Sequence, residues 1–238
     1  MPYTDLTTHD RNTLKRWLQR CRYRDALAAF VNAEHNGIRV IDFGAGDGEL
    51  VCQIAQLGCI DAWAYEPTPA LASEAKQKLA GYERVVVTDS LENIESGTFD
   101  YVFCLEVFEH LPENASSSAL TEIHRLLKPE GKAIIGVPHE IFLPALAKGV
   151  FRMCRRYGSF DASPANVLRA FIGCPPLDRP VAEIAPGFAF HFHHLGFDYR
   201  AFERQLQENF QVCKKWFSPI PPLGALLNSE VYFLLTKS

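Results

Sequence analysis

Short apolar runs alternate along the first half of the chain with segments whose apolar residues recur at helical spacing. The apolar runs cover residues 39–43, 62–66, 84–88, 100–105 and 133–137. The segments with helical spacing between them cover residues 49–57, 69–79 and 119–127. Strands that alternate with helices predict a parallel sheet whose crossover connections are right-handed.

The pattern before this repeat predicts one more helix. Residues 12–32 have apolar side chains near a helical period, and we expect a helix there that breaks near Cys21. Basic residues lie between the apolar ones: Lys15, Arg16, Arg20, Arg22 and Arg24. These side chains are compatible with binding a phosphate on an acceptor, and equally with a solvated surface.

The pattern after the repeat is different. Beyond Val137 the alternation stops, and a segment rich in proline, phenylalanine and basic residues runs to Phe192 before a helical pattern at 199–209. The apolar runs at 210–217 and 230–236 follow without room for a crossover helix between them. Parallel neighbours need such a connection, so these two strands are expected to pair as an antiparallel hairpin.

Composition restricts the class of protein. The chain has 238 residues, 47% of them hydrophobic and 22% charged, which fits one elaborated globular domain. A formal net charge of −4 disfavours a nucleic-acid partner. Seven cysteines without a C-x-x-C pair, a polar start and no long apolar stretch favour a cytoplasmic protein. The expected divisions are an N-terminal helical segment (1–35), a cofactor-binding core (36–137), an insertion or lid (138–198) and a C-terminal helix with a hairpin (199–238).

A glycine-rich turn follows the first predicted strand. Gly44, Gly46 and Gly48 let the backbone approach a ligand closely, because glycine has no Cβ and tolerates positive φ. Glu66, at the end of the next strand, can accept both hydroxyls of a ribose. The dinucleotide fingerprint would place its third glycine at Glu49, and acidic residues at this helix start disfavour a pyrophosphate. The pattern therefore favours a nucleoside ligand without phosphate at this point.

Four motifs in sequence order resemble those of class I S-adenosylmethionine-dependent methyltransferases. They are residues 40–48, Glu66, residues 88–91 and residues 104–111, the last reading Cys-Leu-Glu-Val-Phe-Glu-His-Leu. This last stretch and Leu-Lys-Pro-Glu-Gly131 are most similar to the branch with ubiquinone and menaquinone methyltransferases. The resemblance implies a Rossmann-like α/β fold: a seven-stranded, mostly parallel sheet with an antiparallel last strand, helices on both faces, and a helical lid after the fifth strand.

The resemblance also implies S-adenosylmethionine as cofactor and assigns its contacts. The glycine turn and its acidic neighbour would hold the methionine portion, Glu66 the ribose, and the residues after the third strand the adenine. The end of the fourth strand would face the sulfonium. The implied cofactor residues are Asp42, Gly44, Ala45, Gly46, Gly48, Glu66, Pro67, Asp89, Ser90, Leu91, Leu105 and Glu106.

Methyl transfer from a sulfonium is an in-line displacement, so alignment supplies much of the catalysis, and a base helps when the acceptor is a hydroxyl. The candidate bases are His110, His139, His193 and His194. Glu106 and Glu109 with His110 form a donor set that could also hold Mg²⁺ or Zn²⁺. We nevertheless expect a site without a metal.

The insertion carries the features that concern the acceptor. Residues 141–157 predict an amphipathic helix with Phe142, Leu146, Val150 and Met153 on one face and basic residues opposite. Such a helix can cap an active site or lie on an anionic membrane surface. We expect methylation of a hydroxyl on a small-molecule, lipid-linked or sugar-linked acceptor. The alternatives are an inactive binding module with this fold and, with less support, a nicotinamide-dependent oxidoreductase.

Overall fold

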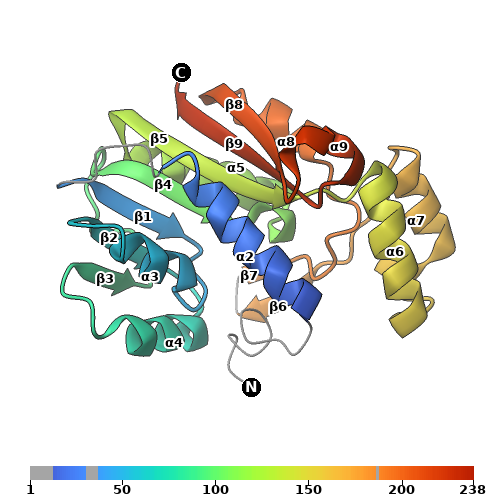
Figure 1. Cartoon of the computed structure of the whole chain (residues 1–238), viewed down its shortest axis with the longest axis horizontal. Coiled ribbons are helices and arrows are strands. Elements are labelled where there is room, and N and C mark those ends of the chain that lie inside the picture. Colours follow the sequence, from blue (N-terminus) through green and yellow to red (C-terminus); the bar gives the residue numbers. More distant parts are fainter. Residues whose placement is uncertain (1–12, 31–36, 186–187) are drawn as a thin grey trace.

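A seven-stranded mixed sheet forms the centre of the fold, with strand order β3-β2-β1-β4-β5-β9-β8 (Figure 1). The computed structural model describes residues 13–30, 37–185 and 188–238. Strands β1 to β5 pair in parallel, whereas β9 is antiparallel to both β5 and β8. The predicted mostly parallel sheet with a reversed last strand is confirmed. Its strands are β1 (Arg39–Phe43), β2 (Asp61–Tyr65), β3 (Val85–Thr88), β4 (Phe99–Leu105), β5 (Leu127–Pro138), β8 (Phe210–Ser218) and β9 (Glu230–Lys237).

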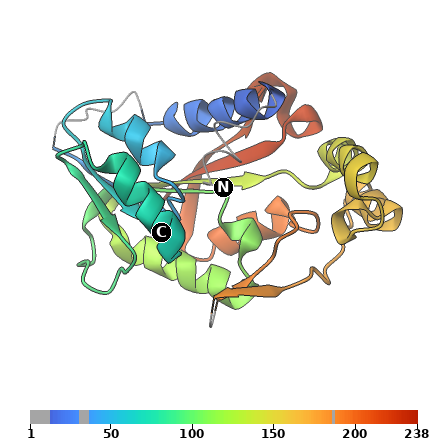
Figure 2. The ribbon, with the colours of Figure 1, turned by 90° about the horizontal axis from the view of Figure 1, so that it is seen from below.

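Helices cover both faces of this sheet (Figure 2). They are α2 (Thr13–Leu27), α3 (Glu49–Ala55), α4 (Pro69–Leu79), α5 (Glu113–Leu126) and α8 (Tyr199–Leu206). Leu27 of α2, Leu50 of α3 and Leu79 of α4 belong to the apolar cluster on one face. Ile123 of α5 and Phe202 of α8 belong to the cluster on the other face.

Alternate residues of the central strands divide between these two clusters. Val40 and Ile134 join the cluster with α2, α3 and α4. Their neighbours Ile41 and Ile135 join the cluster with α5 and α8. Successive side chains of a strand point to opposite faces, so a strand that is covered on both sides is apolar at nearly every position. This explains the short continuous apolar runs in the sequence.

Helix α2 runs from Thr13 to Leu27 without interruption, so the predicted break near Cys21 is wrong. Cys21 is 3% exposed and lies on the buried side of the helix. The Trp216 indole donates to the Asp25 carbonyl at 3.1 Å, and the Tyr232 hydroxyl donates to the Arg22 carbonyl at 3.1 Å. These bonds fix α2 to β8 and β9. Residues 12 and 32, the ends of the predicted helix, lie outside the described residues.

Two predicted boundaries differ from the structure by several residues. The helix expected at 119–127 begins at Glu113, because its first turns are polar and carry no apolar period. The strand expected at 133–137 begins at Leu127, since its pairing with β4 continues across an irregularity opposite Phe99. Both errors come from polar residues at the end of an otherwise correctly predicted element.

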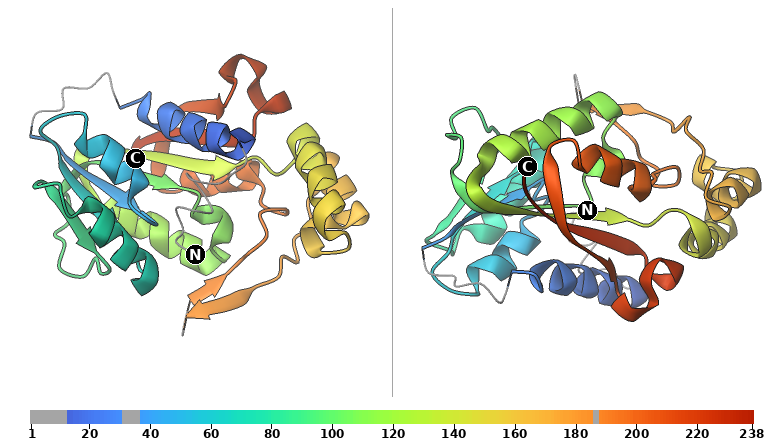
Figure 3. Two further views of the ribbon diagram at one scale, coloured as in Figure 1. Left: turned by 60° about the horizontal axis from the view of Figure 1, so that its bottom comes forward. Right: turned by 90° about the horizontal axis from the view of Figure 1, so that it is seen from above.

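The insertion after β5 contains two helices and a small hairpin. They are α6 (Phe142–Arg156), α7 (Pro164–Phe171), β6 (Ala182–Ala185) and β7 (Phe188–Phe190), with the 3-10 turn η2 (Phe160–Ala162) between the helices. The predicted helix at 141–157 is confirmed, whereas α7, β6 and β7 were not predicted. Figure 3 shows α6 and α7 side by side beyond the end of β5. The insertion therefore lies at the carboxyl end of the parallel strands, where ligands of such sheets bind.

Candidate active site

In the turn between β1 and α3, the glycine backbone packs closely against neighbouring side chains. Gly44, Gly46 and Gly48 have φ values of 85°, 54° and 79°, in the left-handed region that favours glycine. A Cβ on Gly44 would lie 2.5 Å from Val107 Cγ2, and one on Gly48 would lie 2.7 Å from Leu79 Cδ1. These positions have no space for a larger residue. The backbone of the turn is therefore fixed at the carboxyl ends of β1 and β4.

Three buried carboxylates surround this turn. Asp42, Asp47 and Glu66 are 4%, 3% and 6% exposed. Glu66 accepts one hydrogen bond from the Gly46 N–H at 2.9 Å and one from the Thr68 N–H at 2.8 Å. Burial, with Glu66 and Asp47 nearby, raises the pKa of Asp42 to about 8. A nearby cation favours the charged form of a carboxyl group, so this arrangement suits a ligand that carries positive charge.

The start of α3 is acidic as well. Lys78 of α4 forms an ion pair with Asp47 at 3.1 Å and a closer one with Glu49. This lysine was not among the predicted site residues, and it balances part of the acidic charge from outside the turn. A ligand phosphate at this helix start would meet both carboxylates, so the structure agrees with a ligand that has none there.

The other residues of the predicted cofactor site follow neighbouring strands. Pro67 comes directly after Glu66 at the end of β2, and Leu105 ends β4 half-buried. Asp89 and Ser90 are exposed after β3, whereas Leu91 is buried in the core. Because β3, β2, β1 and β4 are adjacent and parallel, all these strand ends meet at one edge of the sheet. Ala45 is buried within the glycine turn.

Glu106, directly after β4, has φ of 55°, which is strained for a residue other than glycine. Its carboxylate lies 3.0 Å from the Arg22 guanidinium, which also binds Glu230 at 2.8 Å. Burial and the nearby Glu230 and Glu109 outweigh Arg22, and they raise the pKa of Glu106 well above its usual range. The strained backbone thus places an acidic side chain in a buried charge cluster beside the site.

The role of Arg22 in this cluster was not predicted from the sequence. Its neighbours in the chain suggested a surface or phosphate-binding residue, yet the side chain pairs with two carboxylates from the ends of β4 and β9. Arg22 follows Leu18 by one helical turn, on the side of the helix that carries apolar residues. A basic residue on the apolar side of a helix was the one sequence feature that could have indicated a buried ion pair. Glu230 had no signal, because only the sheet order brings β9 near β4.

His110 ends the 3-10 helix η1 (Phe108–His110) after β4. Its Nδ1 donates to the His191 carbonyl at 2.7 Å, because a carbonyl can only accept. This bond leaves Nε2 with its lone pair. The ring stacks on Phe190 at 4.3 Å between centroids, and burial lowers the pKa of His110. His110 is therefore a neutral imidazole whose tautomer is fixed by the backbone of the insertion.

The other predicted histidines occupy different environments. His194 contacts His110 edge to face at 4.8 Å, and burial lowers its pKa to about 3. His193 Nδ1 lies 3.3 Å from Asp161 on the insertion side. His139 is fully buried against Tyr199, and its Nδ1 donates to a backbone carbonyl at 3.1 Å. The structure thus brings His110 and His194 together and places His139 within the core.

Glu109 completes a group that could hold a metal. Its carboxylate, the His110 imidazole and the His194 imidazole offer ligand atoms within 4.8 Å of one another. Both Glu109 oxygens are buried without a hydrogen-bond partner among the described residues, and burial raises the pKa of Glu109 to about 8. The donor set differs from the one considered in the sequence, since Glu106 faces Arg22 and His194 takes its place.

Three of the four basic residues of α6 pair with buried carboxylates, although Arg155 and Arg156 are also exposed. Lys148 and Arg152 both bind Glu140, a fully buried carboxylate, at 2.9 Å. Arg156 binds the equally buried Asp161 at 2.5 Å. Burial alone would raise the pKa of Glu140, but Lys148 and Arg152 outweigh burial and hold that pKa well below its usual range. The apolar face also differs, because Val150 is 48% exposed.

Comparisons with known proteins define the family. A family model described as a methyltransferase domain matches residues 14–209. The match covers most of the chain, and the chain therefore belongs to the methyltransferase domain family. The predicted class I S-adenosylmethionine-dependent methyltransferase, with S-adenosylmethionine as cofactor, is confirmed at the level of family and fold.

Individual relatives agree with this assignment. The "Ubiquinone biosynthesis O-methyltransferase" of Xanthomonas oryzae pv. oryzae (strain PXO99A) is 36% identical over 106 residues, which are 42% of this chain and 42% of that protein. The match thus spans less than half of that relative.

Solved structures extend the likeness to the whole fold. A crystal structure of a protein from Pyrococcus horikoshii OT3 superposes with a TM-score of 0.67 at 16% identity, covering 100% of this chain and 99% of that one. The 1,6-didemethyltoxoflavin-N1-methyltransferase of Burkholderia thailandensis, with bound 1,6-didemethyltoxoflavin and S-adenosylhomocysteine, superposes with a TM-score of 0.59 at 17% identity. That match covers 97% of this chain and 83% of that chain.

Proposed function

We propose that this chain transfers a methyl group from S-adenosylmethionine to a hydroxyl of a small-molecule, lipid-linked or sugar-linked acceptor. The observation that carries the proposal is the state of His110. Its Nδ1 is bound to the His191 carbonyl, so Nε2 keeps its lone pair, 3.8 Å from Glu109 Oε1, and can accept a proton from the attacking hydroxyl. The lowered pKa keeps the imidazole neutral near pH 7, which a base requires.

The charge of the cofactor site supports the methyl donor. S-adenosylmethionine carries two cationic groups, a sulfonium and an ammonium. The glycine turn that would hold it is surrounded by the buried carboxyl groups of Asp42, Asp47 and Glu66. Glu66 follows β2 and is held by backbone N–H groups, which leaves oxygen lone pairs for the ribose hydroxyls. Alignment of the sulfonium with the acceptor then supplies about 7–11 kcal/mol of the catalysis.

The two alternatives from the sequence have less support. A nicotinamide dinucleotide would place its pyrophosphate beside Asp47 and Glu49, which already share Lys78. An inactive binding module has no need for a tautomer-fixed imidazole next to the end of β4. Both alternatives remain measurable, because the first predicts binding of NADH and the second predicts binding of S-adenosylmethionine without turnover.

The experiment combines binding with transfer. Isothermal calorimetry of the whole chain with S-adenosylmethionine, S-adenosylhomocysteine and NADH tests the cofactor. Transfer of a labelled methyl group to phenolic, sugar and lipid-linked hydroxyl acceptors, and to the matching amines, tests the acceptor atom. We expect binding of the first two ligands and labelling of hydroxyl acceptors. Labelling of amines alone would contradict O-methylation.

Contact with a membrane through residues 141–157 stays a prediction. Leu143, Val150 and Phe151 on α6 are 44%, 48% and 53% exposed, which supports it. Among the described residues, no helix combines the length and apolar character needed to cross a bilayer. We expect salt-sensitive co-sedimentation with anionic phospholipid vesicles, which Val150→Ser weakens. No sedimentation at low salt would contradict this contact.

A further inference from the structure

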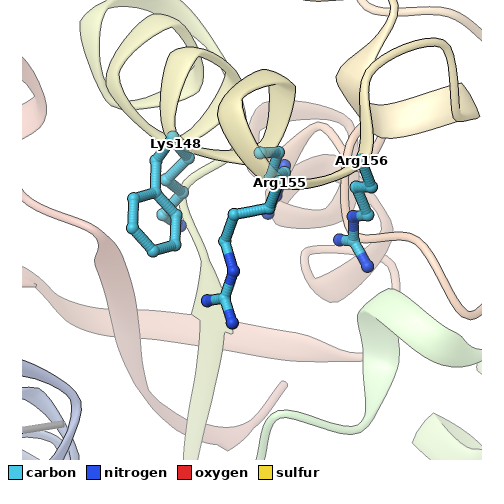
Figure 4. Close-up of a pocket in the computed structure, with 5 residues that line it drawn as sticks. Lys148, Arg155 and Arg156 are labelled. Atoms are coloured by element: carbon cyan, nitrogen blue, oxygen red, sulfur yellow. The ribbon is translucent and has the colours of Figure 1, made fainter.

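A cavity of about 600 Å³ opens beside α6 and is lined by basic side chains. Figure 4 shows Lys148, Arg155 and Arg156 leaving the helix on one side, with Arg155 extending into the open space. The lining residues are Lys148, Phe151, Arg152, Arg155 and Arg156. A volume of this size is within the range of small-molecule pockets.

The positive charge of this cavity is only partly neutralised. Two buried carboxylates, Glu140 and Asp161, face the lysine and two of the arginines. Among the described residues, Arg155 has no carboxylate partner, and its guanidinium lies over the Phe151 ring at 5.3 Å. The four cations and two carboxylates leave a formal surplus of two positive charges.

The buried carboxylates hold the cavity in a fixed position relative to the candidate base. Glu140 lies two residues after the end of β5 and anchors Lys148 and Arg152 of α6. Burial lowers the pKa of His194, and the negative charge of Glu140 offsets part of that effect. His194 in turn contacts His110. The buried Glu140 and the half-buried His194 thus lie between the basic cavity and His110 at the carboxyl end of the sheet.

We infer that this cavity binds an acidic group, a phosphate or a carboxylate, of the methyl acceptor, with Arg155 as its principal ligand. The inference rests on the proposed function and narrows the acceptor to an anionic molecule. A guanidinium presents parallel N–H donors that match the oxygens of a phosphate or carboxylate. Phe151 beside Arg155 offers an apolar surface for the adjoining part of the acceptor.

The binding test uses pyrophosphate as the probe and the whole chain as the protein. Arg155→Gln removes the unpaired cation, while Arg169→Gln removes an exposed arginine of α7 that does not line the cavity. Isothermal calorimetry should show pyrophosphate binding that Arg155→Gln weakens about tenfold and Arg169→Gln leaves unchanged. No binding to the unsubstituted chain, or equal weakening by both variants, overturns the inference.

A second measurement tests whether the anion that binds is part of the methyl acceptor or part of another molecule, such as a membrane lipid. Labelled methyl transfer to catechol is compared with transfer to 3,4-dihydroxybenzoate, which differs by one carboxylate. Arg155→Gln should raise the KM for the carboxylated acceptor about tenfold and leave that for catechol unchanged. An equal effect on both acceptors overturns the inference. Arg155-dependent binding to anionic vesicles without pyrophosphate binding also overturns it, because the cations then serve a membrane surface.

The two proposals fail in different ways. If S-adenosylmethionine binds and hydroxyl acceptors are labelled but pyrophosphate does not bind, the proposal that the basic cavity binds an anion is wrong and the proposed function stands. If pyrophosphate binds through Arg155 but no hydroxyl acceptor is labelled, the cavity stands as an anion site and O-methylation is wrong.

Discussion

Glu66 is held by the backbone around it, through the N–H groups of Gly46 and Thr68. Its position is therefore set before any ligand arrives, which lowers the entropy that ligand binding must overcome. Glu106 and Glu109 differ, because one buried oxygen of Glu106 and both oxygens of Glu109 have no hydrogen-bond partner among the described residues. At this scale the site contains one preorganised acid and two acids with unused hydrogen-bonding capacity.

Replacing Glu66 tests the ribose contact. Glu66→Gln removes the negative charge while keeping the size of the side chain. Hydrogen bonds to a charged group contribute about 1.5–3 kcal/mol, so S-adenosylmethionine should bind at least about tenfold more weakly in calorimetry. Glu92→Gln, an exposed change in the loop after β3, serves as the control. An unchanged Kd for the Glu66 variant would show that the carboxylate does not contact the ribose.

Replacing His110 tests the base. His110→Gln should lower kcat by about 10²- to 10⁴-fold and leave S-adenosylmethionine affinity nearly intact. The pKa of His110 lies below the ordinary histidine value of 6.5, so the imidazole is neutral at pH 6.5 and above and becomes protonated only at lower pH. Activity of the unsubstituted chain should therefore fall only as the pH drops below about 6.5. His124→Gln on α5 is the matched control, and full activity of the His110 variant would reject the role.

Charge joins helix α6 to the segment that follows β5. Glu140 is completely buried and binds two cations of the helix, so water screens these ion pairs only in part. Breaking a buried pair from one side leaves uncompensated charges, which is strongly destabilising. The position of the cavity therefore depends on this carboxylate.

Glu140→Gln should lower the free energy of unfolding by about 3–5 kcal/mol, measured by urea denaturation at pH 7. The pKa of Glu140 is held low in the folded chain, so its contribution is present above the unfolded pKa of about 4.3 and disappears as the pH falls through the folded value. Glu122→Gln removes a partly exposed pair on α5 and should change stability by less than about 1 kcal/mol. Equal effects of the two changes would show that Glu140 is not the anchor.

The contact between α6 and α7 depends on a small residue. A Cβ on Gly149 would lie 2.5 Å from Val167 Cγ1. Gly149→Ala should therefore separate the helices and cost about 1–3 kcal/mol of stability. Val167→Ala provides the missing space. The double variant should therefore lose less stability than the sum of the losses of the two single variants. Purely additive losses in thermal unfolding would contradict this contact.

The parallel strand ends, α2 and the insertion surround the site from different parts of the chain. Residues from β1, β2, β4, β9 and the insertion meet at one end of the sheet (Figure 1). A ligand that contacts several of these segments stabilises the folded state as a whole, because the unfolded chain does not bind it.

S-adenosylmethionine should therefore raise the melting temperature of the whole chain. At one hundred times its Kd, the stabilisation is about 2.7 kcal/mol, or about 5 to 10 °C for a chain of this size. S-adenosylhomocysteine should act in the same direction, and NADH should leave the melting temperature unchanged in differential scanning fluorimetry. A shift with NADH alone would favour an oxidoreductase.

The amino-acid sequence by itself determined the order of elements, the sheet and the family. Strands buried on both faces must be apolar throughout, and the glycine turn needs positive φ, so both features are visible locally. The motifs at 40–48 and 104–111 added the class of enzyme. Local patterns were weakest where polar residues begin α5 and where the β6–β7 hairpin lies.

Only the tertiary structure decided which charges meet. Arg22 and Glu230 lie 208 positions apart, and the pairing of β9 beside β5 brings them together. The same holds for Glu140, because the helical pattern does not predict its pairing with Lys148 and Arg152 of α6. Burial turns such charges into fixed pairs, because a low-dielectric interior does not tolerate them alone. Periodicity shows which side chains are apolar, but long-range packing decides which polar side chains are paired and which, like Arg155, remain available for a ligand.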